Sequence, residues 1–164
     1  MIYLGIGSNL ASKKGGKLVN IKKTIKLLNF YSVKVTKVSS FYETPSYPNK
    51  KYPKFINVIV SANYKGSPEA LLKILLYIEK KMGRIRIHKN EPRICDIDII
   101  DFKGKIYNSK NLDIPHKLTV SRNFVLLPLK EINPAWIHPI NKKDVNNLIN
   151  KLPLKMRNEI TRLK

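Results

Sequence analysis

Residues 91–100 read EPRICDIDII, a segment in which two aspartates interrupt the isoleucines of an apparent buried strand. In an extended strand, residues two apart point to the same face, which places the Asp96 and Asp98 carboxylates side by side at roughly 7 Å. At that range two like charges repel by about 2 kcal/mol for an effective dielectric constant of about 20. A chain with this pair therefore needs either an edge strand whose polar face meets water or a bound cation.

The scarcity of acidic residues makes this cluster informative. The chain has 32 lysines and arginines against 11 aspartates and glutamates, and Asp96, Asp98 and Asp101 are three of its five aspartates. Magnesium prefers one or two carboxylates together with the phosphate oxygens of a substrate. A metal-bound phosphate site is therefore the favoured interpretation of the pair.

The strong positive charge has two interpretations. A formal net charge of +21 would suit nucleic-acid binding if the basic residues formed one patch. However, 26 of the 32 are lysines scattered along the chain, which favours solvated faces over one basic stripe. The arginines are more informative, because a chain that uses lysine so freely needs a reason for the planar, two-pronged guanidinium. Four of the six surround the aspartates: Arg84, Arg86, Arg93 and Arg122.

The hydrophobic patterns predict the order β-α-β-β-α-β. This order indicates an α+β fold, a ferredoxin-like βαββαβ sandwich with extra C-terminal elements, in which helices cover one face of a mainly antiparallel sheet. Apolar residues on both faces of 54–64 place that strand in the middle. A β-bulge is expected in the strand 32–45, where the apolar phase shifts. The predicted elements are strands over 2–8, 32–45, 54–64 and 94–102, helices over 18–28, 67–82 and 142–152, and a helix or irregular turn over 121–129.

The length suits one domain over residues 1–164. No run of about 18 apolar residues is present, and the first residues lack the features of a signal peptide. We therefore expect a soluble, cytoplasmic protein with no membrane partner. The single cysteine, Cys95, can form no internal disulfide and is expected to be a small core residue.

Three further polar residues have two interpretations each. Glu79 stands at the border of an apolar helical stripe, where it is either a surface residue or the wall of a site. Asn57 interrupts the strand FINVIV, and a buried unpaired amide there would cost about 1 to 3 kcal/mol, so it needs a backbone or ligand partner. His116 taken alone is more often a hydrogen-bonded turn residue than a catalyst.

Six fragments of this sequence form an ordered set: GSNL (7–10), SSFYETP (39–45), FINVIV (55–60), IEKKMGRIR (78–86), PRICDIDII (92–100) and IPHKLTVSRNFVLLPL (114–129). The combination of P-R-x-x-D-x-D with the later P-H-x5-R-x-F is the most specific part. In order and approximate spacing the set resembles a known family, that of 6-hydroxymethyl-7,8-dihydropterin pyrophosphokinase, an enzyme of folate synthesis.

The resemblance implies transfer of the β,γ-diphosphate of ATP to the pterin hydroxymethyl group, with release of AMP. It implies two magnesium ions held by Asp96 and Asp98, and catalytic roles for Arg84, Arg93, Asp96 and Asp98. It assigns ATP binding to Glu79, Arg84, Arg86, Arg93, Ile99, His116 and Arg122.

The resemblance also implies a pterin site, in which two phenylalanines stack on the ring and an asparagine binds its edge. The residues at these positions are Thr44, Pro45, Tyr47, Phe55, Asn57 and Phe124. ATP and the pterin are then the only expected partners, with no nucleic acid, and we expect a monomer.

Two other classes of protein share some of these features. Nucleotide transferases of the polymerase-β type also combine a GS turn with a D-x-D strand, but their two motifs lie close together in the sequence, whereas two helices and two strands are expected between Ser8 and Asp96 here. A ferredoxin-like RNA-binding module would stack bases on exposed aromatic residues of its sheet. No predicted strand carries such a cluster, and an aspartate pair would repel phosphate without a metal.

Overall fold

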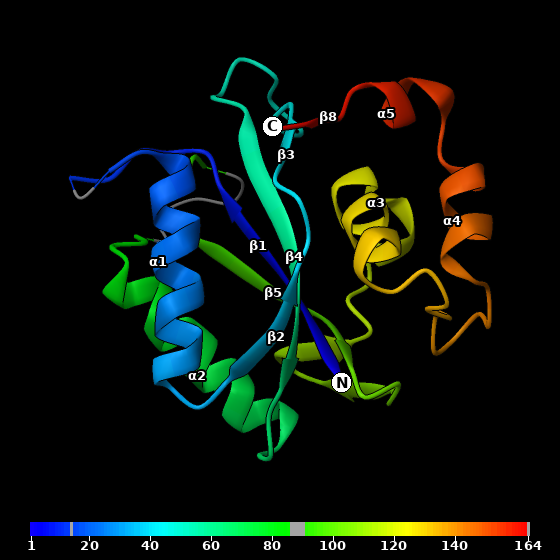
Figure 1. Ribbon diagram of the computed structural model, residues 1–164, viewed down its shortest axis with the longest axis horizontal. Helices are drawn as coiled ribbons and strands as arrows, with labels where there is room; N and C mark the ends of the chain where they lie inside the picture. Colours follow the sequence, from blue (N-terminus) through cyan, green and yellow to red (C-terminus); the bar gives the residue numbers. More distant parts are fainter. Residues whose placement is uncertain (14, 86–90, 164) are drawn as a thin grey trace.

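The computed structural model describes residues 1–13, 15–85 and 91–163 of the chain. Strands and helices alternate through the first two thirds of the sequence, and helices dominate the last third (Figure 1). The elements are β1 (Ile2–Ser8), α1 (Lys17–Phe30), β2 (Lys34–Val38), β3 (Tyr42–Thr44), β4 (Phe55–Asn63), α2 (Pro68–Lys81), β5 (Asp96–Phe102), β6 (Tyr107–Ser109), β7 (Leu112–Ile114), the 3-10 turn η1 (Thr119–Ser121), α3 (Asn123–Ile132), α4 (Val145–Lys151), α5 (Leu154–Asn158) and β8 (Thr161–Arg162).

Local signals account for the elements that the sequence predicted well. The Ser67 hydroxyl accepts a hydrogen bond from the Ala70 backbone N–H at 3.2 Å and caps α2, with Pro68 at the first helical position. Gly83, with a φ of 94°, ends the helix because glycine adopts this left-handed conformation without a steric penalty. The prediction of one strand over 32–45 was wrong, since residues 39–41 are not in a strand and separate β2 from β3. The expected bulge is confirmed as a register shift in β2.

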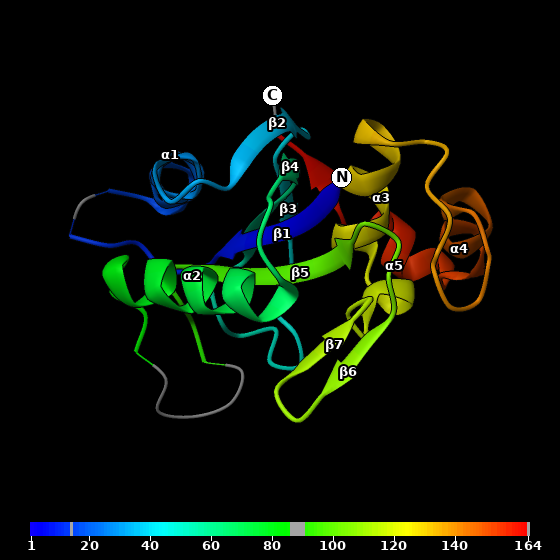
Figure 2. The ribbon, with the colours of Figure 1, turned by 90° about the horizontal axis from the view of Figure 1, so that it is seen from below.

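The sheet is antiparallel at every pairing among the described residues. Its order is β5-β1-β4-β3-β8, and β2 also pairs with β4. The central position predicted for 54–64 is confirmed, because β4 pairs with three other strands. β6 and β7 form a separate hairpin that extends beside β5 (Figure 2).

Helices lie on both faces of this sheet (Figure 1). On one face, α1 and α2 bury Ile21, Leu28, Leu71 and Leu75 against β1, β4 and β5. On the opposite face, α3 and α4 pack on a smaller apolar cluster. The expectation that helices cover one face was therefore wrong. Three strands also carry apolar residues on the opposite face, and α3 and α4 bury them: Tyr3, Ile59 and Ile100.

A bulge in β5 decides where the third aspartate of the cluster points. Leu4 pairs with Ile99 and Tyr3 pairs with Asp101, so Ile100 is the extra residue of the bulge. Asp101 is buried, and its carboxylate accepts hydrogen bonds of 2.7 Å from Trp136 Nε1 and 2.7 Å from the backbone N–H of Gly104. Asp101 therefore belongs to the hydrogen bonding of the fold and not to a site with the other two aspartates.

This placement predicts that Asp101→Ala destabilises the protein. The substitution leaves the buried indole N–H of Trp136 without its acceptor, so the free energy of unfolding should fall by about 1 to 3 kcal/mol. Urea denaturation measures this change. The matched variant Asp101→Asn keeps an acceptor oxygen and should lose less, and an Asp101→Ala protein as stable as the wild type would contradict the assignment.

No helix among residues 1–13, 15–85 and 91–163 is long and apolar enough to cross a membrane.

Candidate active site

A cavity of about 970 Å³ lies between α2, the start of β5 and the β6–β7 hairpin. It brings together the predicted nucleotide-binding residues of the described chain from three separate stretches of sequence. Arg86, the remaining residue of that prediction, lies outside the described residues. The predicted residues that line the cavity are Glu79, Arg84, Arg93, Asp96, Asp98, Ile99, His116 and Arg122.

Negative charge is concentrated at this cavity in an otherwise basic protein. Six of the eleven acidic side chains in the sequence line it, although lysines and arginines outnumber acids almost three to one overall. Such a concentration indicates a site where carboxylates have a purpose beyond solubility. The six are Glu69, Glu79, Glu91, Asp96, Asp98 and Asp113.

Three arginines balance the charges of the two central carboxylates. Asp96 pairs with Arg93 through Oδ2 and Nη1 at 2.9 Å, and its other oxygen pairs with Arg84. Asp98 pairs with Arg122 Nη1 through Oδ2 at 3.1 Å. β5 does lie at the edge of the sheet, but the two carboxylate side chains are only 25% and 34% exposed. The alternative of a polar face that simply meets water is therefore wrong, because the face is lined with guanidinium groups.

Two glycines of β1 lie opposite the aspartates, and neighbouring side chains come close to both of them. In the antiparallel register, Gly7 of β1 is opposite Asp96 and Gly5 is opposite Asp98. Neither glycine adds a side chain to the sheet face that the aspartates share. Glycine inside a strand often marks a place where a ligand or another group approaches the backbone closely. These two residues were not predicted as part of the site, although both stand in the strand that runs into the GSNL motif.

Glu79 is a buried wall of the cavity and not a surface residue. It is 3% exposed, and its Oε1 accepts a hydrogen bond of 2.8 Å from the backbone N–H of Ile97 and pairs with Arg84. It thereby fixes the β5 backbone beside Asp96 and the guanidinium that contacts the same aspartate. Arg84 is held between carboxylates from α2 and from β5.

His116 is a neutral hydrogen-bond donor in this environment. Burial lowers its pKa below the ordinary value, although the charge of Asp98 acts in the opposite direction. Its Nδ1 accepts the backbone N–H of Leu118 at 3.1 Å, which places the ring proton on Nε2. That Nε2 lies 3.8 Å from Asp98, whose own pKa is raised by burial and by the neighbouring Asp96. His116 is thus a hydrogen-bonded turn residue that also lines the cavity.

The predicted pterin residues lie next to this cavity and not inside it. Asn57 Nδ2 donates to the Thr44 hydroxyl at 2.8 Å, and both residues are buried, so the partner of this amide is a side chain. Pro45 is half-buried, and Tyr47 is 82% exposed, so its ring is not brought to the others.

Each of the two predicted stacking rings lies beside an arginine that is predicted to bind ATP. The Arg93 guanidinium carbon is 5.8 Å from the centre of the Phe55 ring, and that of Arg122 is 5.4 Å from the centre of the Phe124 ring. The sequence did not indicate the pair of Arg93 and Phe55, because these two residues are far apart along the chain, whereas Arg122 and Phe124 stand together in the R-x-F motif. They connect the aromatic residues directly to the carboxylate cluster.

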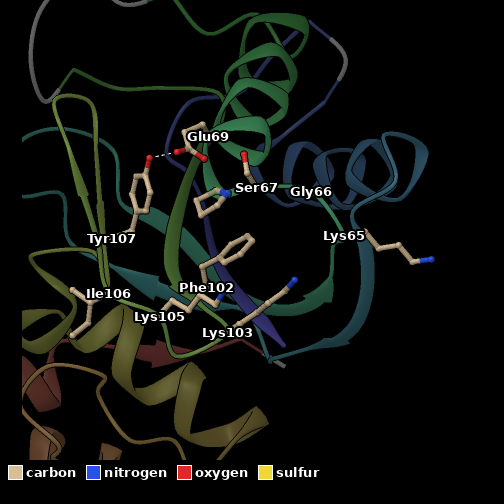
Figure 3. Close-up of a pocket in the computed structure, with 10 residues that line it drawn as sticks. Lys65, Gly66, Ser67, Glu69, Phe102, Lys103, Lys105, Ile106 and Tyr107 are labelled. Atoms are coloured by element: carbon tan, nitrogen blue, oxygen red, sulfur yellow. Dashed lines mark hydrogen bonds between the residues drawn. The ribbon is translucent and has the colours of Figure 1, made fainter.

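A second cavity of about 540 Å³ lies at the start of α2 and contains no predicted site residue (Figure 3). The Tyr107 hydroxyl donates to the Glu69 carboxylate at its wall, and Glu69 also lines the larger cavity. Lys65, although part of the lining, points away from the other side chains in Figure 3. We find no arrangement of charged groups there that resembles the cluster on β5.

No group of three or more histidine, cysteine or acidic side chains is placed to hold a metal ion in the described ranges. The two aspartates on one sheet face are therefore the carboxylate donors that the site offers. This set is too small for a closed protein cage but suits magnesium shared with substrate phosphates.

An antiparallel sheet flanked by helices, with paired carboxylates and arginines at one cavity, defines an α+β protein with a charged site suited to a phosphate-bearing ligand. Residues 3–134 match the family model of 7,8-dihydro-6-hydroxymethylpterin-pyrophosphokinase (HPPK). The chain belongs to this family.

Named relatives and solved structures agree with this assignment. The chain is 34% identical over 142 residues to 2-amino-4-hydroxy-6-hydroxymethyldihydropteridine pyrophosphokinase of Aquifex aeolicus, covering 87% of this chain and 86% of that one. It is 34% identical over 151 residues to a folic acid synthesis protein of Pneumocystis carinii, of which it spans 20% while 92% of this chain is covered. A variant of Plasmodium falciparum HPPK-DHPS with pterin and p-hydroxybenzoate shares the fold, with a TM-score of 0.74 at 18% identity over 98% of this chain and 46% of that one.

The expectation that Cys95 is a small core residue is confirmed, and it predicts an unreactive thiol. Cys95 is buried, its sulfur lies 3.3 Å from the Thr24 hydroxyl, and burial raises its pKa to about 12. Because the thiolate is the reactive form, the native protein should not react with an aromatic disulfide reagent at pH 8. The same reagent should titrate one thiol after unfolding in urea, and fast labelling of the native protein would disprove this assignment.

Proposed function

We propose that this protein transfers the β,γ-diphosphate of ATP to the hydroxymethyl group of 6-hydroxymethyl-7,8-dihydropterin and releases AMP, as a step of folate synthesis. The observation that carries the proposal is the carboxylate pair of β5, held among three arginines, two of which also contact the phenylalanines of the neighbouring aromatic site. Family membership supports the same reaction.

Magnesium fits the carboxylate pair. Asp96 and Asp98 share one sheet face opposite two glycines, and carboxylate oxygens are the hard donors that this cation prefers. We infer that they hold two magnesium ions together with the phosphates of ATP. When bound, the ions would neutralise charge on the polyphosphate and polarise its oxygens.

The arginines are placed to change partners when the nucleotide binds. Arg84, Arg93 and Arg122 pair with the carboxylates. The same planar fork that binds a carboxylate also fits a phosphate. If the carboxylates held magnesium, the three guanidinium groups would be available to bind phosphate oxygens. Neutral His116 would donate its Nε2–H to a phosphate oxygen beside them.

The pterin is expected beside the phosphates, with Phe55 and Phe124 stacking on its ring and Asn57 binding its edge. The Thr44 hydroxyl orients the Asn57 amide, and the backbone of residues 44–47 completes the pocket. The hydroxymethyl oxygen would then attack the β-phosphorus while AMP leaves. Positioning and charge neutralisation supply most of the catalysis in phosphoryl transfer. Asp96 is the candidate acceptor for the proton that the attacking hydroxyl loses.

We further infer that residues 1–164 form one domain of the ferredoxin-like class. The order β5-β1-β4-β2 with antiparallel neighbours, and with α1 and α2 on one face, supports this class. We expect a cytoplasmic monomer whose ligands are ATP and the pterin, with neither nucleic acid nor membrane as a partner.

The decisive experiment is identification of the nucleotide product when the purified protein is mixed with ATP, magnesium and 6-hydroxymethyl-7,8-dihydropterin. AMP formed in step with a diphosphorylated pterin supports the proposal. ADP would indicate ordinary phosphoryl transfer on this fold, and the absence of a pterin-dependent product would refute the proposed function.

The carboxylate pair makes a specific prediction. Asp96→Ala or Asp98→Ala should lower kcat by several orders of magnitude, since each removes a donor that no neighbouring residue replaces. Steady-state assays at saturating magnesium measure the loss, and circular dichroism checks the fold. The matched control is Asp144→Ala, which removes the cap of α4, does not line the cavity and should keep the turnover number. A folded Asp98→Ala protein with normal turnover would overturn the metal assignment.

A lysine should not replace Arg93. Its guanidinium binds Asp96 and lies over Phe55, and the ammonium group of lysine lacks both the two-pronged geometry and the planar face. Arg93→Lys should therefore lower kcat by about 10²-fold or more, a loss typical of misplaced reacting groups. Arg162→Lys, at an exposed ion pair, is the control and should behave like the wild type. Full activity in Arg93→Lys would make Arg93 a structural residue.

A further inference from the structure

The side chain of Asn9 connects two loops that reach the site from different parts of the sequence. It directly follows β1 and is 2% exposed. The backbone N–H of Arg93 donates to Asn9 Oδ1 at 2.7 Å, and the Arg93 carbonyl accepts the N–H groups of Asn9 and Leu10 at 3.1 and 3.2 Å. The backbone of Arg93 is therefore held on both sides by the turn after β1.

The same amide closes the base of the loop that runs from β3 to β4. Asn9 Nδ2 donates to the Ser46 hydroxyl at 3.1 Å and to the carbonyl of Pro53 at 3.1 Å. The Ser46 hydroxyl itself donates to the Pro53 carbonyl at 2.6 Å. The loop that this amide closes directly follows Thr44 and directly precedes Phe55.

The turn that carries Asn9 is itself anchored. Asn20, buried in α1, donates through Nδ2 to the Leu10 carbonyl at 3.1 Å, and its Oδ1 accepts the Ser12 hydroxyl at 2.8 Å. Asn9 is thus fixed by the end of β1 on one side and by α1 on the other. Because Asn9 is held in place on both sides, it can fix the position of one loop relative to the other, which a mobile residue could not do.

Both sets of hydrogen bonds made by Asn9 influence the position of one group, the guanidinium of Arg93. Asn9 fixes Arg93 through its backbone, and through the 46–53 loop it also fixes the start of β4, where the Phe55 ring lies 5.8 Å from the same guanidinium. The guanidinium in turn binds Asp96. We propose that Asn9 is a positioning residue that fixes the phosphate-binding side of the site relative to the pterin-binding side. This inference rests on the proposed function, since both sides take their names from it.

The test is a double-mutant cycle between Asn9→Ala and Arg93→Ala, with kcat as the readout. Asn9→Ala should lower kcat by about 10- to 100-fold, as expected for a small misplacement of a reacting group. If Asn9 acts through Arg93, the double variant should be no more than about 3-fold slower than Arg93→Ala alone, because interacting residues are not additive. A residue that only stabilises the fold would give independent losses that multiply, and that result would overturn the proposal.

Two further variants keep the test sharp. Asn133→Ala, which removes a 2.8 Å hydrogen bond to the Tyr3 hydroxyl far from the cavity, is the matched control. It should change kcat by less than about 2-fold and combine additively with Arg93→Ala. Ser46→Ala removes only one bond of the network and serves if Asn9→Ala does not fold. It should lower kcat to a smaller extent and should again be non-additive with Arg93→Ala, whereas additivity would count against the proposal.

Hydrogen exchange separates failure of this inference from failure of the proposed function. In Asn9→Ala the Arg93 amide and the amides of residues 46–53 should exchange faster together, relative to the β4 amides of the core. Asn133→Ala should leave them unchanged. If the wild type forms no pterin product, the proposed function fails while this comparison still tests the link. Unchanged exchange in Asn9→Ala would show that no such link exists.

Discussion

The organisation of this protein depends on two like charges that stand side by side on one strand. The Asp96 and Asp98 side chains are only about a quarter to a third exposed, so water cannot screen them fully. Arg84 from the end of α2, Arg93 from the loop before β5 and Arg122 from the start of α3 supply the compensating charge. The ion pairs thereby bring three separate segments to one place, and the cavity forms between them.

The second face of the sheet explains why this site is accessible. α3 and α4 cover the part around Tyr3, Ile59 and Ile100, and no residue of either helix is among those that line the cavity. The bulge in β5 lies at this boundary, and beyond it Asp101 binds Trp136. Asp101 thus holds the fold, while Asp96 and Asp98 line the cavity.

The sequence predicted features whose causes are local. The alternation of Asp96 and Asp98 and the cap of α2 at Ser67 depend on neighbouring residues, so both were found. The choice of arginine for each carboxylate, the pairing of Arg93 with Phe55, and the bonds of Asn9 depend on tertiary contacts that no local pattern encodes. The division of 32–45 into two strands also escaped prediction, because it follows from where β4 offers partners.

The pairing of the site arginines with carboxylates has a consequence for selectivity among anions. A protein with a net charge of +21 attracts every polyanion in solution, and ionic strength screens that attraction. At the cavity, however, Arg84, Arg93 and Arg122 are already neutralised, so a bare polyphosphate meets a surface without excess positive charge. Under the proposed function, an anion that arrives with its own divalent counterions would bring a replacement partner for both aspartates. The ion pairs would then favour metal-loaded nucleotides over free phosphates or RNA.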